Sequence, residues 1–183
     1  MRRFIFGMML GCMLSSANAA DDEGLTVGGV RLTLGMERSK ALELLQKNST
    51  VNCLSLGREQ KSTECDVAVT RGNKTKPNFD FLGSVYFTEA GRVKTVMKNY
   101  DQKQWGSDHA KFVSFLYEVM RQYGEKGETF VSSIEEVREP GWVNKSIFFR
   151  SGRKVISVAF GEGGQDGEGK PYRPFVNMYE KLE

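Results

Sequence analysis

The sequence of 183 residues contains a single histidine, and its neighbours decide which chemistry it can support. His109 follows Asp108, so a nucleophilic triad would need a serine such as Ser114 beside it, but no G-x-S-x-G motif is present. A zinc site would need more ligands than one histidine and the few cysteines supply. We interpret His109 as a surface residue in the first turn of a helix. The sequence therefore predicts no catalytic residue, no metal ligand and no cofactor.

A glycine-rich segment, residues 161–169, is the second candidate for chemistry. Glu162, Asp166 and Glu168 carry the ligand type that calcium prefers, but their spacing is not that of an EF-hand. The segment also lacks the order of a phosphate-binding loop, because Lys170 is not followed by serine or threonine. We expect a loop between two strands and leave open whether it binds an ion.

Two other functions stay open as alternatives. A carboxylate-based hydrolase would need Glu135, Glu136 and Glu139 to meet Asp101 in a cleft, where mutual repulsion would raise a carboxyl pKa. A periplasmic carrier of small ligands would need a closed apolar cavity between sheet and helices. Neither alternative has a motif that supports it, so we expect a protein that is not an enzyme.

Aromatic and basic residues on the expected strands give a stronger functional signal. Residues 84–96 are typical of a β-hairpin whose three-residue turn ends at Gly91. Pairing across this turn places Tyr86 on the face opposite the apolar residues that are expected to be buried. Phe148 takes the equivalent position in a second hairpin. Tyrosine, tryptophan and arginine are enriched in binding hot spots. The candidate partner-binding residues are Tyr86, Arg92, Tyr100, Trp142, Phe148 and Arg150.

The N-terminal segment, residues 1–19, is typical of a secretory signal peptide. Arg2 and Arg3 precede an apolar stretch, residues 4–14, which is too short to span a bilayer. Residues 17–19 form a small-x-small cleavage motif. A lipoprotein would instead use Cys12, but that leaves a very short apolar stretch. We therefore expect export to the periplasm or beyond, with no transmembrane segment.

Export also changes the charge of the chain. Loss of two arginines takes the formal net charge from +3 to about +1, so the mature protein is close to neutral. A nucleic-acid partner would require a strong basic balance, so we expect none. Cys53 and Cys65 are then the remaining cysteines, an even pair in an oxidising compartment. We predict that they form a disulfide, which contributes about 3 kcal/mol in the loop-entropy model.

The two hairpins look like a duplication. Residues 84–96 align without a gap on residues 146–158, with identical residues at four positions and similar ones at four more. A helix-like segment precedes each: residues 37–47, and residues 107–124 with an apolar stripe at helical spacing. The sequence predicts an α+β fold of two tandem helix-plus-antiparallel-sheet repeats, residues 20–106 with the cystine hairpin and residues 107–183. Both helices are expected on one sheet face, with the other face open.

This order resembles that of the beta-lactamase inhibitory protein family and of small outer-membrane assembly lipoproteins. The resemblance is carried by the segment 32–45, by the cystine hairpin of Cys53 and Cys65, and by the duplicated hairpins. A second disulfide, which the inhibitor family has, is impossible here. What the resemblance implies is a protein-binding fold without a specified target.

These observations together favour an exported, non-enzymatic protein-binding module of the inhibitor, immunity or envelope-assembly accessory type. Its partner is expected to be another exported or envelope protein. The open, aromatic sheet face is expected to carry the binding.

Overall fold

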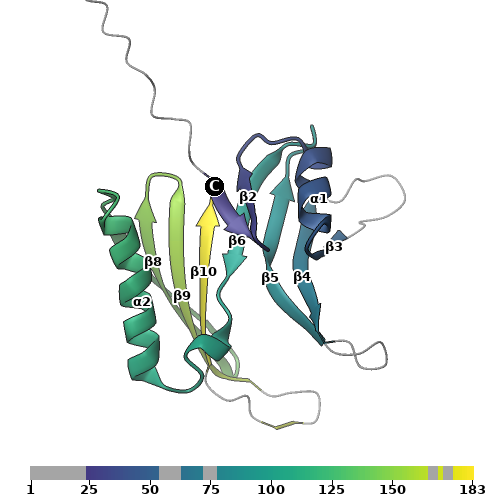
Figure 1. Ribbon diagram of the computed structural model, residues 1–183. Helices are drawn as coiled ribbons and strands as arrows, with labels where there is room; N and C mark the ends of the chain where they lie inside the picture. Colours follow the sequence, from purple (N-terminus) through teal and green to yellow (C-terminus); the bar gives the residue numbers. More distant parts are fainter. Residues whose placement is uncertain (1–23, 54–62, 72–77, 165–168, 171–174) are drawn as a thin grey trace, which may run out of the picture.

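The computed structural model describes residues 24–53, 63–71, 78–164, 169–170 and 175–183. The expected signal peptide lies outside these residues, as do Asp166 and Glu168 of the glycine-rich segment. Strands dominate the described chain (Figure 1). The strands are β1 (Gly24–Val27), β2 (Val30–Thr33), β3 (Thr50–Cys53), β4 (Glu64–Arg71), β5 (Asn78–Phe87), β6 (Val93–Asn99), β7 (Val131–Glu139), β8 (Trp142–Ser151), β9 (Lys154–Gly163) and β10 (Phe175–Leu182). The helices are α1 (Arg38–Gln46), a 3₁₀ turn η1 (Gln102–Gln104) and α2 (His109–Gly124).

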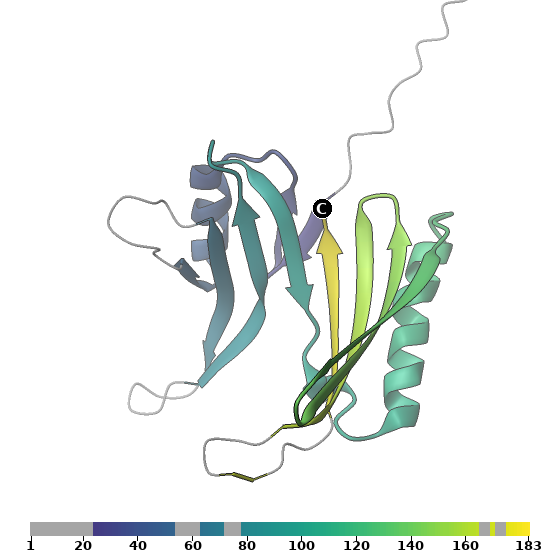
Figure 2. The same ribbon diagram turned by 180° about the vertical axis from the view of Figure 1, so that it is seen from behind.

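One antiparallel sheet organises the molecule. It has eight strands in the order β3-β4-β5-β6-β10-β9-β8-β7. The last strand, β10, lies in the middle, where it pairs with β6 on one side and with β9 on the other. Helices α1 and α2 and the separate β1–β2 hairpin lie on the same face of this sheet (Figures 1 and 2).

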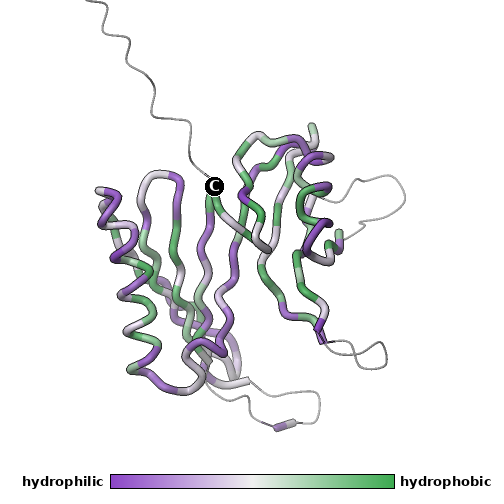
Figure 3. Tube along the Cα trace, viewed as in Figure 1, coloured by the Kyte–Doolittle hydropathy of each residue, from purple (hydrophilic) through white to green (hydrophobic). Residues whose placement is uncertain are grey.

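Local sequence explains the elements that cover this face. Gly28 and Gly29 form the turn of the β1–β2 hairpin with positive φ angles of 59° and 77°, which glycine adopts without a steric penalty. Helix α2 begins after Asp108, whose carboxylate accepts hydrogen bonds from the backbone N–H groups of Ala110 and Lys111. Polar and apolar segments alternate along α2 (Figure 3), as expected of a helix that buries one side.

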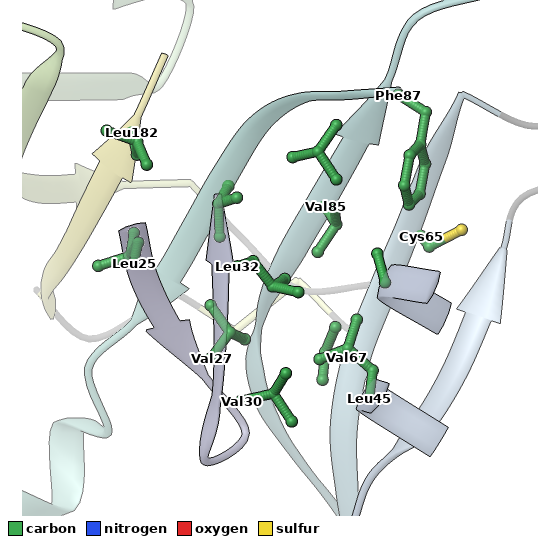
Figure 4. Close-up of a cluster of buried hydrophobic side chains, with 13 residues drawn as sticks. Leu25, Val27, Val30, Leu32, Leu45, Cys65, Val67, Val85, Phe87 and Leu182 are labelled. Carbon is green, nitrogen blue, oxygen red and sulfur yellow. The ribbon is translucent and has the colours of Figure 1, made fainter. Parts of the chain in front are cut away.

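The buried residues form two clusters on the helix side of the sheet. The first packs α1 and the β1–β2 hairpin onto β4, β5 and β6 (Figure 4). The second packs α2 onto β9 and β10, with Phe112 against Trp105 at a ring-centroid distance of 5.3 Å. Leu182 of β10 is 1% exposed and belongs to the first cluster, although it comes from the far end of the chain. The C-terminal strand therefore completes the core of the N-terminal half.

The predicted disulfide is present. The sulfur atoms of Cys53 and Cys65 are 2.03 Å apart, and the two residues face each other across β3 and β4. This bond fixes the short strand β3 to the edge of the sheet. It also fits folding in an oxidising compartment. None of the described helices is long and apolar enough to cross a membrane.

Two β-bulges change which side chains face the core. In β5 the register moves from Val67 opposite Gly83 to Ala68 opposite Phe81, so Leu82 is an extra residue. In β6 the register moves from Tyr86 opposite Thr95 to Phe87 opposite Val93, so Lys94 is extra. Because side chains alternate along a strand, each bulge exchanges the faces of all residues beyond it.

The predicted fold class is wrong. The described residues are mostly strand and form one continuous eight-stranded sheet plus a hairpin, not two tandem helix-plus-antiparallel-sheet repeats. The helices are unequal, with 9 residues in α1 and 16 in α2. The β1–β2 hairpin packs only into the first cluster, and Leu182 joins the two halves. The boundary expected between residues 106 and 107 falls between η1 and α2.

The two aligned hairpins also differ in register. In the first, Phe87 pairs with Val93 around a turn in which Gly91 has a φ of 73°. In the second, the equivalent Phe149 pairs with Ile156, because the turn contains only the residues between Ser151 and Lys154. The ungapped sequence match therefore does not correspond to a match in strand pairing.

Gly83 provides a test of the β5 bulge. Its φ is 148°, and a Cβ atom there would lie 1.9 Å from the carbonyl oxygen of Met97 on β6. We expect Gly83→Ala to lower the free energy of unfolding by roughly 3 kcal/mol or more, because backbone strain adds to displacement of the neighbouring strand. Urea unfolding measures this change.

Gly29→Ala is the matched control for Gly83→Ala. Gly29 also has a positive φ, 77°, but nothing lies within 4 Å of its added Cβ. We expect it to cost only about 1 kcal/mol, the conformational penalty alone. Equal effects of the two substitutions would contradict the close approach of β5 and β6.

Candidate interaction surface

The sheet face opposite α1 and α2, called the open face from here on, carries a row of aromatic side chains across several strands. Phe148 of β8 pairs with Ser157 of β9, which pairs with Tyr179 of β10, which pairs with Asn99 of β6. The Asn99 side-chain amide then donates to the carbonyl oxygen of Phe81 on β5, at 3.4 Å. Directly opposed residues share a face, so Phe148, Ser157, Tyr179 and Asn99 form one row, and Phe81 lies on the same face next to its end.

The β5 end of this row is the most exposed. Phe81 is 40% exposed and Phe79, two residues earlier on the same face, is 57% exposed. They line a hollow of about 470 Å³ together with Thr50, Val51, Asn52, Asp66 and Ala68. Its lining is mostly apolar, with Asp66 as the one charged residue. Two large phenylalanines at an open hollow retain apolar surface that a partner can bury.

The rest of the row alternates large and small residues. Ser157 has no exposed surface, because it lies between the larger side chains of Phe148 and Tyr179 in the register. Arg150 lies two residues beyond Phe148 on β8, with its guanidinium 5.4 Å from the centre of the Phe148 ring. This cation–π contact holds an exposed arginine beside the row.

Tyr86 lies on the open face of β5, as predicted, near the row. It is half-buried and opposes Glu64 of β4 and Thr95 of β6. Burial, followed by a hydrogen bond to the Glu64 carboxylate, raises the pKa of Tyr86 to about 12 from its ordinary 10.0. The hydroxyl of Ser84, next on this face, donates to Asp66 at 2.6 Å.

The open face also has a charged corner where β8 and β10 end. Arg150 and Lys181 both contact the carboxylate of Glu183, and the Arg153 side chain donates to the Glu183 backbone carbonyl at 2.9 Å. The hydrogen bond from Lys181, with a smaller contribution from Arg150, lowers the pKa of the Glu183 carboxyl. The corner beside the aromatic row is therefore basic, and the Glu183 carboxylate neutralises part of its positive charge.

The predicted partner-binding residues are not all brought together. Tyr86, Phe148 and Arg150 lie on the open face, and Trp142, six residues before Phe148 on the unbroken strand β8, shares that face by alternation. Arg92 lies elsewhere: its guanidinium contacts Glu37 and donates to the Gly35 carbonyl, next to the start of α1.

Tyr100 is on the helix side, contrary to the face that the sequence predicts. Its ring packs edge-on against Phe115 of α2, with the centroids 5.3 Å apart. Its hydroxyl donates to the carboxylate of Glu180 at 2.8 Å, and burial beside this carboxylate raises the Tyr100 pKa well above its ordinary value. The bulge at Lys94 is the physical reason, because it exchanges the faces of the β6 residues that follow.

Between the β1–β2 hairpin and α2 lies a cleft of about 440 Å³, and its polar character bears on the small-ligand alternative. Glu180, 5% exposed, is one of the residues that line it, and the ammonium of Lys98 lies 3.8 Å from the Glu180 carboxylate. Lys154 also lines it and contacts Glu128 at 2.6 Å. This lining does not provide the closed apolar cavity that a carrier of small apolar ligands would need.

The carboxylates of the hydrolase alternative do not converge. Glu135 and Glu136 point to opposite faces of β7, opposite Ser146 and Lys145, and both are exposed. The Asp101 side chain accepts a hydrogen bond from the Lys103 backbone. His109 is exposed as the first residue of α2. Within the described residues, no group of three or more histidine, cysteine or acidic side chains could hold a metal ion.

Sequence reasoning missed Phe79, Phe81 and Tyr179. Strict alternation along β5 assigns Phe79 and Phe81 to the same face as Val85 and Phe87, which is the core. The extra residue at Leu82 moves them to the open face. Gly83 was the available signal, because an isolated glycine within a strand often marks a bulge.

The sequence matches no protein-family model, and it has no significant match among curated proteins or solved structures. The resemblance to the beta-lactamase inhibitory protein family therefore stays a prediction. The open face has to be interpreted from its own geometry.

The environment of Tyr86 gives a titration test. In the difference between the tyrosinate absorbance of the wild type and that of Tyr86→Phe, we expect a phenol with a pKa of about 12. The folded state favours the neutral phenol, so this contribution to stability is complete below about pH 10 and is lost as the pH rises through about 12. A difference that titrates near 10 would show that Tyr86 is solvated and not packed against Glu64.

Proposed function

We propose that this protein is an exported, non-enzymatic module that binds another exported or envelope protein on its open face. The observation that carries the proposal is the aromatic row from Phe148 through Tyr179 to Phe81, together with Phe79 beside it. Aromatic side chains contribute most of the binding energy in many protein interfaces. While these side chains are exposed to water on a sheet face, they contribute less to the stability of the core than they would if helices covered them.

The size of the row suits a protein partner. It extends from β5 to β8 across β6, β10 and β9, which at the usual strand spacing corresponds to about 19 Å. A standard interface buries about 800 Å² on each partner, so the row would form the centre of such a patch and not its whole area. A small molecule would instead favour a deep, enclosed site. Asp66 at one end is acidic and Arg150 at the other is basic, so the two ends of the surface carry opposite charges.

Export is part of the proposal. The disulfide between Cys53 and Cys65 fits an oxidising compartment, and the signal-like segment at residues 1–19 supplies the route. We propose a periplasmic or secreted location after cleavage, and a role of the inhibitor, immunity or envelope-assembly accessory type. Each of these roles needs an exposed recognition surface and no catalytic group on the protein itself.

Site-specific photo-crosslinking in living cells tests the binding surface. A benzophenone amino acid at Phe81 or at Phe148 should yield adducts with a partner protein, which mass spectrometry identifies. The matched control is Tyr117, a 64% exposed aromatic residue of α2 on the opposite side of the molecule. Adducts at Tyr117 with none at Phe81 and Phe148 would assign binding to the helix side and reject the proposal.

Alanine variants then test the energetics with the partner so identified. We expect Phe81→Ala and Phe148→Ala each to weaken binding about tenfold, the equivalent of 1.4 kcal/mol lost at a hot spot. Phe81 is 40% exposed, so its substitution should leave thermal stability nearly unchanged. Tyr117→Ala should affect neither property. Unchanged affinity in both open-face variants would contradict the proposed function.

A further inference from the structure

Strand β7 forms the outer edge of the sheet, and its surface is apolar at intervals. All nine residues of β7 are exposed, and among the described strands it pairs only with β8. Val131 is 74% exposed, Ile134 77% and Val137 53%. The backbone groups on its outer side thus form an unused row of donors and acceptors, which is a template for another strand.

The opposite edge of the sheet is protected, whereas β7 carries charged residues (Glu135, Glu136, Arg138 and Glu139) but lacks the other usual forms of protection. Strand β3 has only 4 residues and ends at the disulfide-bonded Cys53. Strand β7 contains no proline and no lysine, and its register with β8 has no bulge along its whole length. Monomeric sheet proteins commonly use such devices to prevent edge pairing. A long, regular and partly apolar edge without a proline, a lysine or a bulge is suited to pairing with another strand.

We propose that β7 pairs antiparallel with β7 of a second copy of this chain, with Ile134 at the twofold axis. An axis perpendicular to the sheet keeps the helix-bearing faces of both copies on one side, so only residues that point to the same face can oppose each other. In the register centred on Ile134, this residue opposes its own copy. Val131 then opposes Val137 of the other chain, so every exposed apolar residue of β7 meets an apolar residue.

The polar residues of β7 fit the same register. Ser132 opposes Glu136 of the other copy, and Ser133 opposes Glu135, so each serine hydroxyl can donate to a carboxylate. No glutamate faces another glutamate within this pairing. The strand therefore carries its own complement, and this self-complementarity identifies a second copy as the occupant of the edge.

The two neighbouring symmetric registers do not fit. Centred on Ser133, the pairing would place Ile134 against Ser132 and Val131 against Glu135. Centred on Glu135, it would place Glu135 against its own copy and Ile134 against Glu136. Like charges directly opposite each other across strands are destabilising, and the apolar side chain would lose its apolar neighbour. Sequence and symmetry thus favour the register centred on Ile134.

The dimer leaves the proposed binding function unaffected. Pairing at β7 joins the two sheets edge to edge, so the open faces of both copies stay exposed and lie on one side. Phe148 and Phe81 do not lie on β7. Failure of the dimer would therefore leave the open-face proposal standing, and the reverse is also true.

Analytical ultracentrifugation of the exported protein tests the proposal. We expect a species of twice the chain mass that dissociates on dilution. Ile134→Lys places two ammonium groups opposite each other at the axis and should give a monomer. Val113→Lys is the matched control, because Val113 is a 62% exposed apolar residue on α2, and it should leave the dimer intact. Circular dichroism establishes that both variants are folded.

A mixture of variants tests the self-opposed position itself. Ile134→Lys and Ile134→Glu should each be monomeric alone, and should form a dimer when mixed, because opposite charges then meet at the axis. Three results would overturn the proposal: a monomeric wild type at all concentrations, a dimer that survives Ile134→Lys, or a mixture that stays monomeric. The first of these results would leave a strand of another protein as the alternative occupant of this edge.

Discussion

The pairing of β6 with β10 is the constraint on which the rest of this structure depends. It brings the last strand of the chain into the centre of the sheet and places Leu182 in a core otherwise built from the N-terminal half. Lys98 and Glu180 oppose each other across this junction on the helix side, where the Tyr100 hydroxyl also reaches the carboxylate. A buried carboxylate is tolerated only with such partners, because desolvation without them costs several kcal/mol.

The same pairing assembles the binding surface that we propose. Asn99 and Tyr179 oppose each other on the open face, so the aromatic side chains of β5 become continuous with those of β8 only through β6 and β10. Two bulges then decide which residues join them. The extra residue in β5 moves Phe81 outward, and the extra residue in β6 moves Tyr100 inward. Exposed aromatics and the buried Tyr100–Glu180 pair are thus consequences of the same local irregularities.

Much of the local structure could be predicted from the sequence. The positions of the helices follow from apolar spacing, the β1–β2 turn from Gly28 and Gly29, and the disulfide from Cys53 and Cys65. The faces of Tyr86 and Phe148 follow from alternation near the turns. Alternation fails beyond a bulge, which is why the faces of Tyr100 and Phe81 could not be predicted. Repeated sequence does not fix strand order either, because that order depends on the pairing of β10, from the far end of the chain, with β6, which places Leu182 in the first cluster. The two-residue turn after Ser151 likewise ended the apparent repeat.

The most direct measurement of this account is a set of NMR backbone contacts across β6 and β10 in the exported protein. We expect cross-strand nuclear Overhauser effects between Lys98 and Glu180 and between Asn99 and Tyr179, with β10 amides protected from hydrogen exchange to the same degree as those of β9. Contacts from β10 to β9 alone, with rapid exchange of the β6 amides, would contradict this pairing. The aromatic row would then be divided between two separate sheets.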